Sequence, residues 1–171
     1  MKLATRRMVL TIAVILSTAT LGLAQSLPAP TGDPILRVSG DVPLSNDGKE
    51  AVFDLAMLRS LPQTSFTTTT VWTEGGTEFT GVLLKDLLDT LGVSAGSLSM
   101  IAVNDYAAEV PVSDAVVGGP ILAYLVNGKE ISVRDKGPLW LVYPYDSNPD
   151  YRTEVVYSRS IWQLARIEIL P

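Results

Sequence analysis

The hydrophobic pattern is densest in the last third of the chain. Two apolar runs, Ile121–Val126 and residues 139–143, are too short for independent helices and are rich in branched and aromatic residues. Runs of this kind predict buried strands, and we expect both to form the centre of the sheet. After the first run, Asn127 and Gly128 have the residue types of a type I′ turn. This turn predicts a tight reversal into a further strand over residues 129–133.

Branched and alternating residues predict further strands elsewhere in the chain. These strands cover residues 35–38, 65–73, 99–103, 106–110 and 164–170.

Two segments carry helical signals. Five leucines recur at helical spacing over residues 83–91, and Gly92 has the position of a residue that ends a helix. A shorter helix is expected to begin after the N-cap residue Asp54 and to stop at Pro62. Residues 146–157 are polar and aromatic, and they are predicted to form a loop. The elements together predict an α+β fold with mixed, mainly antiparallel sheets and two or three short helices.

The N-terminus has the three-part layout of a secretory signal peptide. Basic residues at positions 2, 6 and 7 precede an apolar segment, and small residues lead to Ala24. We therefore expect a signal peptide over residues 1–24, a flexible leader over residues 25–34 and one domain over residues 35–171. The predicted location is the periplasm or the extracellular space, with no membrane association after cleavage. An uncleaved anchor is the alternative, and the pair Arg6-Arg7 leaves twin-arginine and ordinary export both open.

Charge and composition exclude several classes of function. Beyond residue 24 the chain has 10 basic and 18 acidic residues, and such an acidic balance argues against nucleic acid and anionic membranes as partners. The acidic excess lies before residue 129, so an anionic ligand would meet least repulsion near the C-terminal segment. The chain contains no cysteine and no histidine. We therefore assign no catalytic and no metal-binding residue, and we discount a hydrolase.

Several motifs occur in register along the chain. They are F-x-G-V-x-L-x-x-L-L at residues 79–88, N-D-Y-x-x-x-V-P at 104–111, L-A-Y-x-x-N-G at 122–128, G-P-L-x-L-V-x-P at 137–144 and W-x-x-x-x-I-E-I at 162–169. Together they resemble the sulfite oxidase-type molybdopterin-binding domain over residues 35–169. The resemblance implies that family's α+β fold and, as cofactor, molybdopterin or a related pterin.

Two positions depart from what the resemblance implies. In the family, the strand corresponding to residues 65–73 and the loop after it carry the cysteine whose sulfur binds molybdenum. Here that region offers threonines and Trp72, and a hydroxyl is a poor substitute for a thiolate. The family also places glycines and lysines before the last tryptophan to hold the cofactor's phosphate. This chain keeps Trp162 but supplies only Arg152 and Arg159 there.

The candidate cofactor-binding residues combine aromatic side chains with cations. Trp72 could stack on a planar ring or belong to the core. Asp105 and Tyr106 could mark a pocket edge or an Asx turn. The loop with Arg134 and Lys136 could be a ligand rim or a solvated turn. The complete candidate set is Trp72, Asp105, Tyr106, Arg134, Lys136, Tyr143, Tyr145, Arg159 and Trp162.

The sequence thus predicts an exported protein of oxidoreductase ancestry that is not an independent sulfite oxidase. The alternative is a catalytically silent binding module for a small anionic ligand or a periplasmic partner protein.

Overall fold

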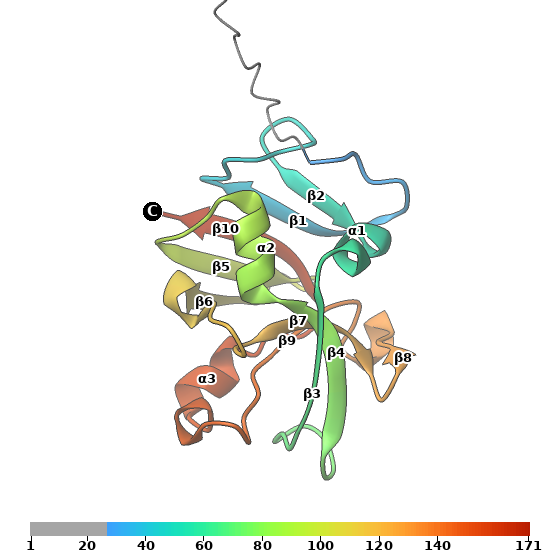
Figure 1. Ribbon diagram of the computed structural model, residues 1–171, viewed down its shortest axis with the longest axis vertical. Helices are drawn as coiled ribbons and strands as arrows, with labels where there is room; N and C mark the ends of the chain where they lie inside the picture. The colour runs from blue at the N-terminus through green and yellow to red at the C-terminus, as the bar shows by residue number, and fades with distance from the viewer. Residues whose placement is uncertain (1–26) are drawn as a thin grey trace, which may run out of the picture.

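The computed structural model describes residues 27–171, so the predicted signal peptide lies outside the described residues. The chain forms two five-stranded sheets (Figure 1). In the first sheet the order is β2 (Ala51–Asp54), β1 (Pro34–Gly40), β10 (Leu164–Leu170), β5 (Ser97–Ala102) and β6 (Ala107–Pro111). In the second sheet the order is β3 (Gln63–Thr68), β4 (Thr77–Leu83), β7 (Ile121–Val126) and β8 (Lys129–Glu130), and β9 (Trp140–Val142) also pairs with β7.

The pairing confirms the predicted α+β class. Among the described strands, only β1 and β10 run parallel to each other, and the other ladders are antiparallel. Helices are short. They are α1 (Leu55–Ser60), α2 (Leu84–Leu91) and α3 (Glu154–Arg159), with 3-10 turns η1 (Val112–Asp114), η2 (Val133–Asp135) and η3 (Pro149–Tyr151). Among the described helices, none has the length and apolar character needed to span a bilayer.

The helix ends have the predicted chemistry. The carboxylate of Asp54 accepts the backbone N–H of Met57 at 2.8 Å, which caps the start of α1. Gly92 ends α2 with a φ of 77°, a left-handed conformation that glycine adopts without a steric penalty. The same Asp54 carboxylate accepts the N–H groups of Thr31 and Gly32 at 2.7 and 2.8 Å. These bonds attach the described part of the expected leader to the domain, and β1 begins at Pro34.

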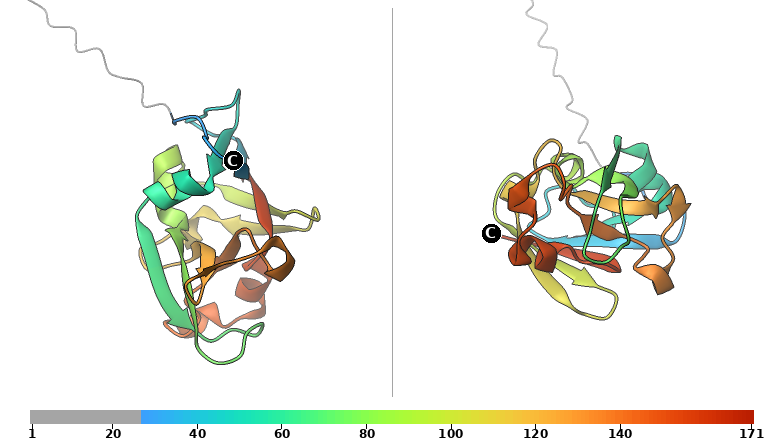
Figure 2. Two further views of the ribbon diagram at one scale, coloured as in Figure 1. Left: turned by 90° about the vertical axis from the view of Figure 1, so that its right-hand side faces the viewer. Right: turned by 90° about the horizontal axis from the view of Figure 1, so that it is seen from below.

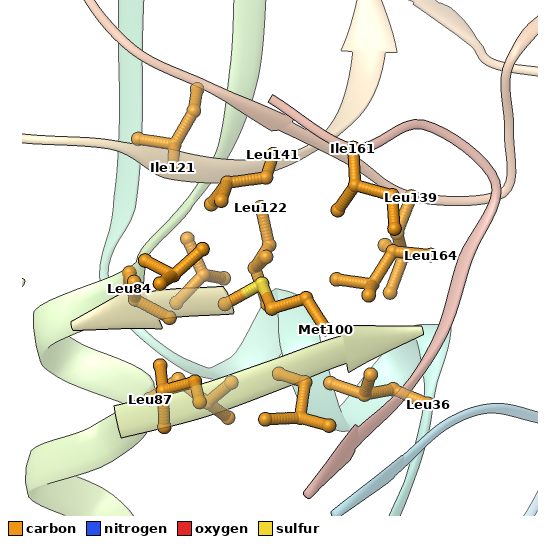
Figure 3. Packing of buried hydrophobic residues seen from close by; sticks show 14 of the residues in the cluster. Leu36, Leu84, Leu87, Met100, Ile121, Leu122, Leu139, Leu141, Ile161 and Leu164 are labelled. Atoms are coloured by element: carbon orange, nitrogen blue, oxygen red, sulfur yellow. The ribbon is translucent and has the colours of Figure 1, made fainter. Parts of the chain in front are cut away.

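The core lies between the two sheets, with α2 closing one side. Figure 3 shows Met100 of β5 and Leu122 of β7 pointing toward one another, with Leu84 and Leu87 of α2 beside them. All four side chains are fully buried. Because apolar area removed from water stabilises a fold by roughly 25 cal/mol per Å², this layer provides the main driving force for folding.

The strand β7 has the predicted central position. It pairs with β4 on one side and with β8 and β9 on the other. On its far side β9 forms an isolated bridge with Trp162, and the N–H of Leu141 donates to the carbonyl of Ile161. Asn127 and Gly128 have φ values of 49° and 73°, which confirms the turn between β7 and β8. The strand expected over residues 129–133 is only two residues long. It ends there because the carbonyl of Ser132 accepts the N–H groups of Asp135 and Gly137, which turns the chain into η2.

Two further predicted elements are wrong in extent or type. The strand expected over residues 65–73 ends at Thr68, because the hydroxyl of Thr70 accepts the backbone N–H groups of Trp72 and Thr73 and forms a turn. Trp72 therefore lies in a loop and not on a strand. The loop expected over residues 146–157 contains η3 and most of α3, whose N-cap Thr153 accepts the N–H of Val156 at 3.3 Å.

Two motif glycines have a structural reason. A Cβ atom at Gly81 would lie 2.0 Å from the carbonyl oxygen of Leu122, where β4 passes close to β7. At Gly137 it would lie 1.8 Å from the carbonyl oxygen of Ile131. Real Cβ atoms do not approach oxygen so closely, so only glycine fits at either position. These two glycines of the sequence motifs therefore support the fold.

Candidate functional site

The candidate site is a pocket of about 580 Å³. Its lining comes from the loop after β3, the turn between β5 and β6, and the end of α3 with the residues that follow it. The loop after β3 and α3 lie at the same end of the molecule in Figure 1 and in the left view of Figure 2. The aromatic residues of the lining are Trp72, Tyr106, Tyr157 and Trp162. The other described lining residues are small, aliphatic or amide side chains, and none of them is charged.

Trp72 is the centre of an aromatic cluster at this pocket. Its ring centroid lies 5.7 Å from those of Tyr157 and Trp162, with interplanar angles of 90° and 77°. Below it lie Trp140 and Tyr145, at 5.8 and 6.3 Å and also edge to face. Edge-to-face packing is the preferred arrangement of aromatic rings, so the cluster is a stable wall. All three tryptophans of the chain belong to it.

The loop that carries Trp72 is held by hydroxyl and carboxylate groups. Besides the two amides that it accepts, the hydroxyl of Thr70 lies 2.8 Å from that of Thr73. One residue earlier, Thr69 donates its N–H and its hydroxyl to the carboxylate of Asp146 at 2.6 and 2.7 Å. These bonds, with the N–H of Thr69 foremost, hold the pKa of Asp146 below its usual range. The threonine run therefore fixes the loop and the position of Trp72.

The pocket floor is organised by Ser160, which is almost completely buried. Its hydroxyl accepts the hydroxyl of Tyr145 at 2.6 Å and donates to the carbonyl of Val156 at 2.8 Å. Its carbonyl accepts the indole N–H of Trp140 at 3.2 Å. Burial raises the pKa of Tyr145 to about 12, against the lowering effect of the hydrogen bond with Ser160. Tyr145 therefore stays neutral at physiological pH and serves as a structural hydrogen-bond donor.

A second set of hydrogen-bonded side chains lies outside the pocket lining and consists of Tyr143, Asp114 and Arg159. The hydroxyl of Tyr143 donates to the carboxylate of Asp114 at 2.7 Å, and Arg159 donates to the same oxygen at 3.0 Å. Burial, with the neighbouring carboxylate as the second cause, raises the pKa of Tyr143 far above its ordinary value. Arg159 thus has a carboxylate partner within the protein, and so does Arg152, which lies 2.7 Å from Asp146. Both arginines therefore hold parts of the protein together through ion pairs.

Two residues with positive φ are sequence neighbours of residues that line the pocket. The described chain has four non-glycine residues with positive φ. One is in the β7–β8 turn, and the others are Asp105 (65°), Lys136 (87°) and Gln163 (53°). Asp105 precedes the lining residue Tyr106, and Gln163 follows the lining residue Trp162. Non-glycine residues in this region carry strain that clusters at functional sites, so the distribution supports a functional role for the pocket.

Lys136 has a specific place beside the cluster. Its ammonium lies 5.6 Å from the ring centroid of Trp140 and 5.9 Å from that of Trp162, which are cation–π distances. Its backbone carbonyl accepts the N–H of Gln163 at 2.9 Å. This hydrogen bond connects two of the residues with positive φ. The lysine is half-buried and lies at the edge of the aromatic wall rather than in the pocket lining.

The structure brings some of the predicted site residues together and separates others. Trp72, Tyr106 and Trp162 line the pocket, with Tyr145 and Lys136 next to the cluster. The remaining members lie apart from the lining. Tyr143 is completely buried and Arg159 is bound to Asp114, Asp105 forms an ion pair with Arg166, and Arg134 is an exposed residue of η2.

Sequence reasoning missed Tyr157, Ser160 and Trp140. The signal for the first two was the N-cap Thr153 followed by Glu154, which begins α3 and turns Tyr157 toward Trp72. The Asx-turn interpretation of residues 104–106 is confirmed, because the amide oxygen of Asn104 accepts the N–H of Tyr106 at 3.3 Å. Tyr106 also lines the pocket, whereas Asp105 does not.

Comparison with known proteins gives one family. No curated protein matches the chain. The sequence model of the oxidoreductase molybdopterin binding domain matches residues 36–146. The matched region contains most of β1, all of β2 to β9 and the pocket residues Trp72 and Tyr106, whereas α3 and Trp162 follow it in the chain. Since the match covers more than half of the sequence, the chain belongs to the oxidoreductase molybdopterin binding domain family.

Proposed function

We propose that this protein is an exported member of its family that binds a small organic ligand in the aromatic pocket and does not act as an independent sulfite oxidase. The observation that carries the proposal is the position of Trp72. The loop after β3, where the family resemblance places the metal-binding cysteine, presents an indole to the pocket. Its threonines donate or accept hydrogen bonds within the protein.

The residues present do not fit a thiolate-bound molybdenum centre. The chain has no cysteine, and among residues 27–171 no group of three or more histidine, cysteine, aspartate or glutamate side chains could hold a metal ion. A threonine hydroxyl does not ionise near neutral pH, so it is a poor substitute for a thiolate as a metal ligand. The two arginines that precede Trp162 are paired with carboxylates, Arg152 with Asp146 and Arg159 with Asp114, which weakens their availability for a phosphate.

The pocket itself supports binding rather than acid–base catalysis. Pockets that bind small molecules are concave, mostly apolar and contain a few polar groups that orient the ligand. This one combines aromatic walls with Asn104, Ser158 and the tyrosine hydroxyls. Val71, Tyr106 and Trp162 are 64%, 55% and 39% exposed, so a ligand can reach the walls from solvent. A histidine or cysteine that could serve as base or nucleophile is absent from the sequence.

The proposal is tested with protein purified from its native source. Metal analysis together with a sulfite-dependent electron-acceptor assay should give far less than one molybdenum per chain and no sulfite oxidation. Mass spectrometry of small molecules released on denaturation should give an organic ligand that a Trp72→Ala variant no longer retains. Near-stoichiometric molybdenum would overturn the proposal, whatever the assay showed.

Export is part of the same proposal and has its own test. The charged start, apolar stretch and small residues before Ala24 occur in the order that signal peptidase requires. Mass spectrometry of the native protein should give a terminus at Gln25, two residues before the described domain begins. An intact Met1 in the membrane fraction would contradict export with cleavage.

A further inference from the structure

We propose that the ligand of the aromatic pocket is a small quaternary ammonium cation. This inference rests on the proposed binding function and specifies the chemistry of the ligand. It depends on three observations: the charge of the lining, the angles between the rings, and the side-chain ammonium of Lys136 beside the cluster.

The lining favours a ligand whose charged group needs no hydrogen-bond partner. The described lining contains neither carboxylates nor cationic side chains. An anion would find no opposite charge there, and a primary ammonium would find no carboxylate for its N–H groups. A quaternary ammonium has no N–H group, and aromatic faces attract it through their quadrupoles. The net negative charge of the whole chain also attracts cations toward the protein.

The ring angles favour a rounded ligand over a flat one. A planar heterocycle is held best between two parallel rings. Here Trp72 is at 90° to Tyr157 and at 77° to Trp162. All three rings line the pocket, and a roughly spherical group can contact surfaces of different orientation at once. A tetraalkylammonium head has this shape, whereas a pterin ring could stack on only one of the walls.

The cluster already attracts one cation. The ammonium of Lys136 lies over the indoles of Trp140 and Trp162, and its backbone has a φ of 87°, which is strained for a lysine. The indoles of this wall therefore bind positive charge within the protein itself. The lysine would repel a cation in the pocket and would attract an anion. Replacing it should therefore raise the affinity for a cationic ligand and lower the affinity for an anionic one.

Fluorescence titration is the direct test, because every tryptophan of the chain belongs to the cluster. Choline should give a saturable change in tryptophan fluorescence. Its neutral isostere 3,3-dimethylbutan-1-ol has the same shape without the charge and should bind at least about tenfold more weakly. Sodium phosphate at matched ionic strength should give no saturable change.

Three variants test the roles of Tyr157 and Lys136 in binding the cation. Tyr157→Leu removes one aromatic wall and should weaken choline binding about tenfold, whereas Tyr157→Phe keeps the ring and should stay within about twofold of the wild type. Lys136→Met should tighten choline binding. Circular dichroism of each variant establishes that the fold is retained before affinities are compared.

The outcomes separate this inference from the proposed function. Equal binding of choline and its neutral isostere, or weaker choline binding after Lys136→Met, would overturn the cation assignment and leave ligand binding in the pocket intact. If choline, the isostere, phosphate and a free pterin all leave the fluorescence of the ligand-free protein unchanged, the binding function fails together with the inference.

Discussion

Trp72 and Tyr157 lie edge to face, with ring centroids 5.7 Å apart and planes at 90°. One residue comes from the loop after β3 and the other from α3, so the contact joins two segments that are distant in the sequence. Trp72 also contacts Trp140, Tyr145 and Trp162. This indole therefore connects aromatic rings that come from separate segments of the chain.

Replacing Trp72 should weaken the fold as well as the pocket. Because the indole is half-buried and has four aromatic neighbours, we expect Trp72→Ala to lower the free energy of unfolding by about 2 kcal/mol. Trp72→Phe keeps part of the wall and should cost about half as much. Urea denaturation followed by circular dichroism measures both changes. Equal stability of the alanine variant and the wild type would mean that the wall makes no net contribution to folding.

The bond between Tyr143 and Asp114 gives a second prediction. Asp114→Ala leaves the completely buried hydroxyl of Tyr143 without a partner, which should cost about 2 kcal/mol of stability. Adding Tyr143→Phe removes the unsatisfied hydroxyl, so the double variant should be more stable than Asp114→Ala alone. A double-mutant cycle by urea denaturation measures the coupling. Strictly additive effects would show that the two groups do not interact.

Alkaline pH should destabilise the protein through its buried tyrosines. Burial raises the pKa of Tyr145 to about 12, whereas the unfolded chain releases this proton near pH 10. Between these values the folded state binds more protons than the unfolded state, so the free energy of unfolding falls as pH rises. The slope is about 1.4 kcal/mol per pH unit for each such tyrosine. Tyr143, whose pKa is raised in the same direction, adds to it.

Urea denaturation between pH 9 and pH 12 measures this slope. Tyr145→Phe removes one titrating group and should make the decline shallower, while below pH 9 it should leave the pH dependence unchanged. An identical slope in the variant would mean that Tyr145 is not the group responsible.

A glycine substitution tests the structural role of the sequence motifs. A Cβ at Gly81 would meet the carbonyl of Leu122 at 2.0 Å, so β4 and β7 must separate to accept Gly81→Ala. We expect a loss of about 3 kcal/mol. Gly76→Ala is the matched control, because its Cβ would meet only a methyl group of Thr67 at 3.2 Å. Similar stability of the two variants, measured by thermal denaturation, would contradict the close-approach argument.

Local patterns determined much of the fold. The apolar run of β7, the leucine spacing of α2 and the alternation of β10 each specify an element through contacts that recur every two or about four residues. Asp54, Asn127-Gly128 and Gly92 specify ends and turns through their own backbone chemistry. Such signals are readable from sequence because both the cause and the effect lie within a few residues.

The error at β3 occurred where a hydroxyl and a distant carboxylate competed with local propensity. The β-branched residues 65–73 favour a strand, but the hydroxyl of Thr70 binds the amides of Trp72 and Thr73 and ends β3 early. The bonds from Thr69 to Asp146 span 77 residues, and no short pattern indicates them.

What the sequence by itself determined was the fold class, the family resemblance and the absence of a thiolate or imidazole. Composition decides which functional groups exist, and short-range periodicity decides which segments become strands and helices. Only the tertiary structure decided which of the candidate residues meet. It placed Trp72 against Tyr157 and Trp162, buried Tyr143, and paired Arg159 with Asp114. Such pairings depend on how the two sheets and α3 pack together, and no single segment of the chain contains that information.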